Sequence, residues 1–207
     1  MAKSKLFLKN SIGQSLKNSS GQFIYKSLPA AYQEVEYIGF SGTQHIDTLV
    51  NGNNVNLEIN IIYEPASSAE QAIFSARTSS SSGISYWTDG YCHFGNSSTK
   101  VAGVSTSGRH QVTLSKSGLW YDGTKLNFTA GNTMANTNLL IGGVAGDTRT
   151  FSGKIYHNKI AISGSIIRYF VPCYRKSDSV IGMYDLVNNQ FYINAGTGTF
   201  TKGANID

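Results

Sequence analysis

The chain has 207 residues, of which 40% are hydrophobic, 12% aromatic and only 14% charged, and its formal net charge is +5. This length supports one substantial core, and no uncharged apolar run is long enough to span a membrane. The charge excess is confined to residues 1–33, which hold five of the 17 basic residues and none of the acidic ones. The neutral remainder argues against a folded nucleic-acid-binding surface, because such a surface carries a basic patch.

Residues 1–27 are predicted to form an N-terminal arm. In this region LKNSIGQS is followed eight residues later by LKNSSGQF, without an acidic residue. A short polar repeat buries too little apolar surface to fold alone, so the arm would dock on a partner, assemble with other copies or fold back as a hairpin on its own body. We expect attachment or oligomerisation, with the anchors Leu6, Leu8, Leu16, Phe23 and Ile24. The only apolar stretch near the start, Leu6-Phe7-Leu8, is too short for a secretory signal. The sequence therefore predicts synthesis in the cytoplasm without export.

The rest of the chain, residues 28–207, shows a period of two, which is typical of strands. Residues 55–64 (VNLEINIIYE) alternate apolar and mostly polar side chains, residues 110–115 (HQVTLS) repeat the pattern, and residues 67–77 (SSAEQAIFSAR) are expected to be a loop or strand. Asp122-Gly123 and Asn188-Asn189 are each predicted to form the turn of a hairpin. Short strands with glycine-rich turns predict an all-β fold, a two-sheet antiparallel sandwich.

The sequence lacks a recognisable catalytic or metal-binding set. Glu34 and Glu36 stand at alternate positions of one segment, but the next alternate position is Ile38. Both glutamates are therefore expected to be an exposed strand face. The four histidines are far apart, at positions 45, 93, 110 and 157, and Cys92 and Cys173 are expected to be buried thiols. We predict no enzyme activity, no cofactor and no local metal site, although a calcium site built from distant loops stays open.

The stretch SYWTDGYCHFGN, residues 85–96, is the candidate glycan-binding site. A sugar packs its apolar face on an aromatic ring while carboxylate, amide and imidazole groups take its hydroxyls. The residues that would supply these groups are Trp87, Asp89, Tyr91, His93 and Asn96. The alternative is that Trp87 points inward and belongs to the core. Weaker candidates are Arg77, Arg109 and the hairpin Trp120-Tyr121-Asp122.

Two signatures resemble those of a known family. Residues 28–48 (LPAAYQEVEYIGFSGTQHIDT) and residues 168–203, with FVPCYR followed by IGMYDL, resemble the opening and closing segments of a domain common in bacteriophage and prophage structural proteins. That domain is similar to laminin-G and concanavalin A-like lectin/glucanase jelly rolls. The resemblance implies a jelly-roll sandwich over residues 28–207 and a virion protein of a fibre, tail or capsid surface. It further implies contact with host-surface polysaccharide and assembly as a homotrimer.

The closing signature also has a physical interpretation. Val171-Pro172 is expected to stop ladder hydrogen bonding at a strand end or edge, because proline lacks the donor. Arg175, Lys176 and Asp178 are expected to form a solvated turn. Tyr174, Tyr184, Phe191 and Tyr192 provide large faces for packing.

Three functions follow from these observations. The first is a non-enzymatic virion protein that binds host glycans and is attached to other virion proteins through residues 1–27. The second is a capsid decoration or head-fibre protein with a purely structural role. The third is a glycan hydrolase, since the fold that the chain resembles includes glucanases. The resemblance implies that this chemistry needs three carboxylates at alternate strand positions, and Ile38 at the third position after Glu34 and Glu36 disfavours it.

Overall fold

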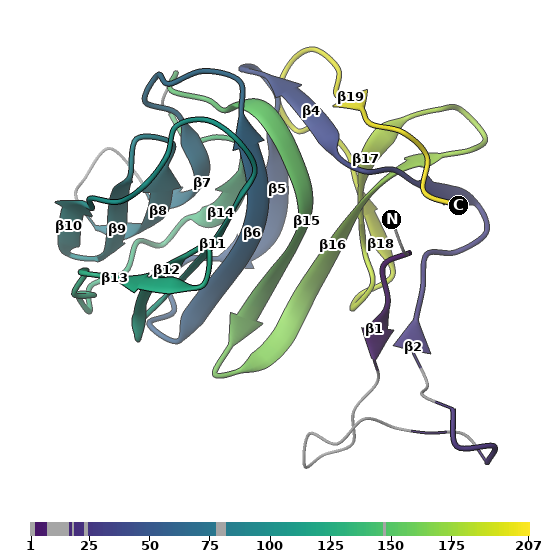
Figure 1. The fold of residues 1–207 in the computed structure, drawn as a ribbon, viewed down its shortest axis with the longest axis horizontal. Coiled ribbons are helices and arrows are strands. Elements are labelled where there is room, and N and C mark those ends of the chain that lie inside the picture. The colour runs from purple at the N-terminus through teal and green to yellow at the C-terminus, as the bar shows by residue number, and fades with distance from the viewer. Residues whose placement is uncertain (1–2, 8–16, 18, 23–24, 78–81, 147) are drawn as a thin grey trace.

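The computed structural model describes residues 3–7, 17, 19–22, 25–77, 82–146 and 148–207. All regular secondary structure in this part of the chain is β-strand, arranged as a smaller and a larger antiparallel sheet that face each other, with a separate two-stranded pair beside them (Figure 1). The prediction of an all-β, two-sheet antiparallel sandwich is therefore confirmed. The described residues include no helix long and apolar enough to cross a membrane.

The smaller sheet has the strand order β10-β9-β8-β7-β14-β5. Its strands are β5 (Ile46–Asn51), β7 (Ala72–Arg77), β8 (Gly83–Trp87), β9 (Tyr91–Gly95), β10 (Ser97–Lys100) and β14 (Asn138–Ile141). The segment predicted as a loop or strand at residues 67–77 thus contains β7.

The larger sheet has the order β13-β12-β11-β6-β15-β16-β17-β18, and β3, β4 and β19 join it at the side of β15 and β16. Its strands are β3 (Tyr32–Glu34), β4 (Ile38–Ser41), β6 (Leu57–Pro65), β11 (His110–Ser115), β12 (Gly118–Tyr121), β13 (Thr124–Leu126), β15 (Ser152–Ile162), β16 (Ser165–Arg175), β17 (Ile181–Asp185), β18 (Gln190–Tyr192) and β19 (Thr201–Lys202).

Alternation along β6 places the core, as predicted. Leu57, Ile59, Ile61 and Tyr63 are fully or almost fully buried, whereas the residues between them are exposed or half-buried. Successive side chains of a strand point to opposite faces, so the buried set packs toward the smaller sheet and the other set lies on the far side. That far side of the larger sheet is called the outer face below.

The two predicted hairpins differ in outcome. Asp122 and Gly123 have φ angles of 47° and 80° and join the paired residues Tyr121 and Thr124, so this two-residue turn is confirmed. The Asn188-Asn189 turn was predicted too short, because Asp185 pairs with Gln190 and the connection spans residues 186–189. The Asp185 carboxylate holds this longer loop by accepting bonds from the loop itself.

The expectation for Pro172 is also corrected, since β16 runs through it. On one side β16 pairs with β15 up to Phe170 and with β3 from Cys173 onward. Pro172 stands between the two segments, and its carbonyl accepts a hydrogen bond from the Val35 N–H at 3.0 Å. The missing proline donor therefore falls where the partner strand changes, and neither ladder loses a bond.

Other details of the sequence analysis are confirmed. Cys92 and Cys173 are buried free thiols, and burial raises the pKa of Cys92 to about 12. Arg175 and Asp178 form an ion pair of 2.6 Å in a solvated turn, each with about two fifths of its side chain exposed.

The described part of the N-terminal arm folds back on the body. β1 (Leu6–Phe7) pairs with β2 (Tyr25–Lys26), and the pair lies outside the sandwich, beside the larger sheet (Figure 1). Leu6 packs against an apolar cluster of the outer face, formed by Tyr169, Val171, Cys173, Tyr184 and Leu186. Among the predicted anchors, Leu8, Leu16, Phe23 and Ile24 lie outside the described residues. Attachment and oligomerisation through residues 1–27 stay predictions.

A buried carboxylate fastens β16 to the turn after β17. Asp185 has no exposed surface, and its Oδ1 accepts hydrogen bonds of 2.9 Å from the backbone N–H groups of Tyr169 and Val187. Its Oδ2 accepts a bond of 2.7 Å from the Asn188 amide and lies 3.6 Å from Arg168 Nε. A buried charge is tolerated only when it is paired and hydrogen-bonded in this way.

Replacing this carboxylate should destabilise the fold strongly. Asp185→Ala leaves buried backbone donors without their acceptor and removes the carboxylate that pairs with Arg168, so the free energy of unfolding should fall by about 3–5 kcal/mol. The measurement is urea denaturation followed by circular dichroism. Asp178→Ala, which removes the exposed carboxylate of the neighbouring turn, is the control and should change stability little. Equal effects of the two variants would contradict the role given to Asp185.

Candidate ligand-binding site

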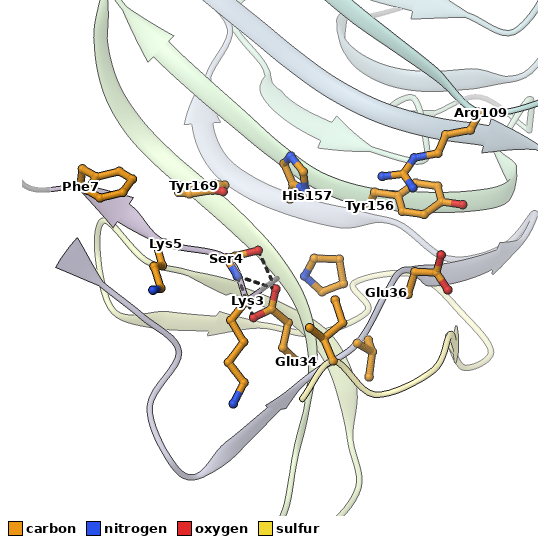
Figure 2. Close-up of a pocket in the computed structure, with 13 residues that line it drawn as sticks. Lys3, Ser4, Lys5, Phe7, Glu34, Glu36, Arg109, Tyr156, His157 and Tyr169 are labelled. Carbon is orange, nitrogen blue, oxygen red and sulfur yellow. Dashed lines mark hydrogen bonds between the residues drawn. The ribbon is translucent and has the colours of Figure 1, made fainter. Parts of the chain in front are cut away.

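A pocket of about 350 Å³ lies between the N-terminal arm and the outer face of the larger sheet (Figure 2). Figure 2 shows Tyr156, His157 and Tyr169 on the sheet and Ser4 of the arm next to them, while the Lys3 and Lys5 side chains point away from these rings. The residues that line it are Lys3, Ser4, Lys5, Phe7, Glu34, Val35, Glu36, Arg109, Tyr156, His157, Tyr169, Pro172 and Ile206. Aromatic rings, cations and carboxylates therefore meet in one concave surface, as in many ligand sites.

A β-bulge in β15 turns two consecutive side chains toward this pocket. Ile155 pairs with Tyr63 of β6 and Asn158 pairs with Ile61, so Tyr156 and His157 together stand opposite a single residue. A regular strand would send these two neighbours to opposite faces. The bulge instead lets both line the pocket.

The ring of Tyr156 is held at its face and at its hydroxyl. The Arg109 guanidinium lies 3.8 Å from the ring centroid, and the Tyr156 hydroxyl donates a 2.8 Å hydrogen bond to Glu64. Glu64 also pairs with Lys154 at 2.7 Å, and the bonds from Lys154 and Tyr156 lower the pKa of this carboxyl. Glu64 therefore stays ionised and orients Tyr156, while Arg109 remains at the exposed rim.

The floor of the pocket is a carboxylate that the arm covers. Glu34 is only 4% exposed, and it accepts hydrogen bonds from Ser4 through the backbone N–H, at 3.0 and 3.1 Å, and through Oγ, at 2.6 Å. The expectation of an exposed Glu34 was wrong, because Ser4 covers this carboxylate. Ser4 lies 30 residues away in the sequence, so no local pattern indicated the contact. Glu36 also lines the pocket and is half-buried, whereas Ile38 is fully buried in the core.

His157 presents a neutral imidazole to the pocket. Burial, followed by the nearby charges of Lys159 and Arg109, lowers its pKa from the ordinary value of 6.5. A neutral ring has one N–H donor and one nitrogen acceptor, which suits a hydroxyl that both accepts and donates. Its neighbours in the pocket include the Arg109 guanidinium, a cationic donor, and the Glu36 carboxylate, an acceptor.

The residues that the sequence analysis proposed for a glycan lie elsewhere, on the smaller sheet. Trp87 is 1% exposed and packs with Ala72, Val144 and Tyr91, and the Arg149 guanidinium lies 4.6 Å from its ring centroid. This burial favours the core interpretation of Trp87 that the sequence left open.

The other four members of that set also make internal contacts. His93 is 3% exposed and lies 2.8 Å from an Arg77 nitrogen. Asp89 pairs with Lys100 at 2.8 Å, and Asn96 accepts a hydrogen bond from the Asn132 N–H. The structure brings Tyr91 and His93 together, with ring centroids 5.0 Å apart, but it gives Trp87 and His93 no open face. Glycan binding by this stretch stays an untested prediction.

Most of the pocket was not predicted from the sequence. Arg109 was predicted only as a weak candidate, and Glu34 and Glu36 only as a partial catalytic set. Two adjacent rings in KIYHNK, residues 154–159, were the available signal, because a regular strand would point one of these polar rings into the core. Nothing in the sequence indicated that Lys3 and Ser4 would reach this face.

No metal site is found among the described residues: no group of three or more His, Cys, Asp or Glu side chains is close enough together to hold an ion.

No family model matches the chain, and no curated protein matches it. Among solved structures, the chain is similar to a native heptameric SAP-like pentraxin from Limulus polyphemus, with 12% sequence identity and a TM-score of 0.48. The match covers 83% of this chain and 95% of that chain. At this identity the similarity concerns the fold alone, and it names no ligand for the present chain.

The burial of Trp87 yields a stability prediction. Trp87→Ala removes a large ring from a closed apolar cluster, so the free energy of unfolding should fall by about 3–5 kcal/mol in urea denaturation. Trp120→Ala, at a half-buried position, is the matched control and should cost clearly less. Unchanged stability of the Trp87 variant together with lost glycan binding would show instead that Trp87 contacts ligand.

Proposed function

We propose that this chain is a non-enzymatic virion protein of a bacteriophage whose β-sandwich binds host-surface glycans. The observation that carries the binding function is the outer-face pocket of Figure 2, in which Tyr156, His157, Arg109 and Glu36 converge. His157, Arg109 and Glu36 supply the donors and acceptors that the hydroxyls of a sugar need. The Tyr156 ring supports this set from below and offers no open face itself, because it is 4% exposed and the Arg109 guanidinium lies 3.8 Å from its centroid. The Arg109 guanidinium at the exposed rim of the same pocket suits a glycan with acidic groups.

The absence of catalysis is part of the proposal, and two observations support it. Glu34 is occupied by the two Ser4 donors, so it is poorly placed to act as a nucleophile or acid on a substrate. The third position of the glucanase pattern, Ile38, belongs to the core. A retaining glycanase needs two free carboxylates about 5–5.5 Å apart across the scissile bond.

The virion role rests on the sequence resemblance of residues 28–48 and 168–203 to phage structural proteins. Attachment to other virion proteins is assigned to residues 1–27, whose lysines and lack of acidic residues favour an acidic docking face. In the described part of the arm, Leu6 and Ser4 contact the body, so docking would extend or rearrange this contact.

Binding is tested on an array of purified bacterial capsular and O-antigen polysaccharides with the labelled full chain. Arg109→Ala removes a charged donor at the pocket rim, so the affinity for any bound polysaccharide should fall about tenfold or more. Lys176→Ala removes an exposed cation that does not line the pocket, and it should bind like the unmodified chain.

Two results would contradict the binding function. One is a folded full chain that binds no polysaccharide on the array, which would favour the purely structural decoration role. The other is release of reducing sugar from a bound polysaccharide, which would establish a hydrolase.

The virion assignment is tested by tracking the protein in particles purified from an induced lysogen that encodes it. The full chain should copurify with particles, and a chain without residues 1–27 should be lost from them while circular dichroism shows that it is still folded. Absence of the full chain from particles would refute the virion role without bearing on glycan binding.

A further inference from the structure

The outer face carries a line of side chains that runs across the strands. The pairing registers place Lys125 opposite Trp120, Trp120 opposite Thr113, Thr113 opposite Asn60, Asn60 opposite Lys159, and Lys159 opposite Tyr169. These six residues, one from each of β13, β12, β11, β6, β15 and β16, are called the cross-strand row. Paired residues point to the same face, so the row is continuous on the outer face.

One end of the cross-strand row is an aromatic hollow of about 290 Å³. Its lining is Glu58, Gln111, Thr113, Trp120 and Gly123. Trp120 is half-buried, so part of its ring packs against the protein and part is exposed to solvent. Lys125 Nζ lies 5.2 Å from the ring centroid. The exposed Glu58 carboxylate makes no hydrogen bond or ion pair with the described residues, which leaves it available as an acceptor.

The polar side chains next to Trp120 are fixed by one another. Asn60 Nδ2 donates to Thr113 Oγ1 at 2.6 Å, and Gln111 Nε2 donates to Asn60 Oδ1 at 3.1 Å. This chain of bonds holds the amide and hydroxyl groups in place before a ligand arrives, which lowers the entropic cost of binding. An indole ring beside a carboxylate, an amide and a hydroxyl is the set of groups that a pyranose requires.

The other end of the cross-strand row leads to the pocket of Figure 2. Tyr169 lines that pocket, and Lys159 Nζ lies 4.9 Å from its ring centroid. Trp120 and Tyr169 are separated by four strand spacings, which amounts to roughly 19 Å. The two hollows are therefore on the same face and are joined by a polar path over Asn60 and Lys159.

We propose that the cross-strand row is the binding track of a glycan chain that lies across the strands. One pyranose packs its apolar face on Trp120, with its hydroxyls on Glu58, Gln111 and Thr113, and the chain continues over Asn60 and Lys159 into the pocket beside Tyr169. The ligand is thus an oligosaccharide or polysaccharide, since a single sugar cannot span both hollows. This inference rests on the proposed glycan-binding function and adds a second subsite to it.

The test uses the full chain and its variants on the same array of capsular and O-antigen polysaccharides. Trp120→Ala should weaken binding of the recognised polysaccharide at least tenfold, Trp120→Phe should retain most of it because a ring remains, and Glu58→Gln should weaken it several-fold. Thermal melting of each variant shows whether the protein is folded, and the exposed Glu58 gives a readout that does not depend on removing the indole. A disaccharide fragment of the recognised polysaccharide should compete far less well than a hexasaccharide.

The outcomes separate the two proposals. If Arg109→Ala weakens binding but the folded Trp120 and Glu58 variants bind normally, the cross-strand row is refuted and the glycan-binding function stands. Equal competition by the disaccharide and the hexasaccharide would likewise refute a track with two subsites. If the full chain binds no polysaccharide, both proposals fail.

Discussion

The structure depends on the burial of one face of the larger sheet against the smaller sheet. Along β6 and β15, residues such as Ile59, Ile61, Ile155 and Ile160 are removed from water, and burial of this kind is the main favourable term in folding. Because a strand alternates its side chains, committing one face to the core leaves the other face free. The binding surfaces proposed for this protein all lie on that second face.

One part of the outer face is covered by apolar contacts, and another part is open to solvent and holds the proposed binding residues. Near β16 and β17 it carries a second apolar cluster, and the N-terminal arm covers part of it through Leu6. Toward β12 it is open and polar, with Trp120 as its large aromatic side chain. The pocket of Figure 2 lies at the boundary, where Ser4 meets Glu34 and where the bulge in β15 turns Tyr156 and His157 outward.

Two local irregularities make this boundary possible. The bulge gives β15 an extra residue on the outer face, and Pro172 lets β16 exchange β15 for β3 without losing a ladder bond. Asp185 then fixes the position of β16 relative to the turn after β17. The bulge, Pro172 and Asp185 each set the path or the pairing of the backbone, and together they position the strands around Tyr169.

The sequence by itself determined the class of fold, because period two in residues 55–64 and 110–115 and the Asp122-Gly123 turn are local signals. It also determined that Cys92 and Cys173 are buried thiols. It could not determine which polar residues would meet, since Ser4 and Glu34, or Asn60 and Thr113, come together only through strand pairing and the folding back of the arm. Trp87 shows the same limit, because alternation gives a side chain's face but only tertiary packing decides whether that face is covered. The tertiary structure therefore placed the candidate site on the outer face of the larger sheet.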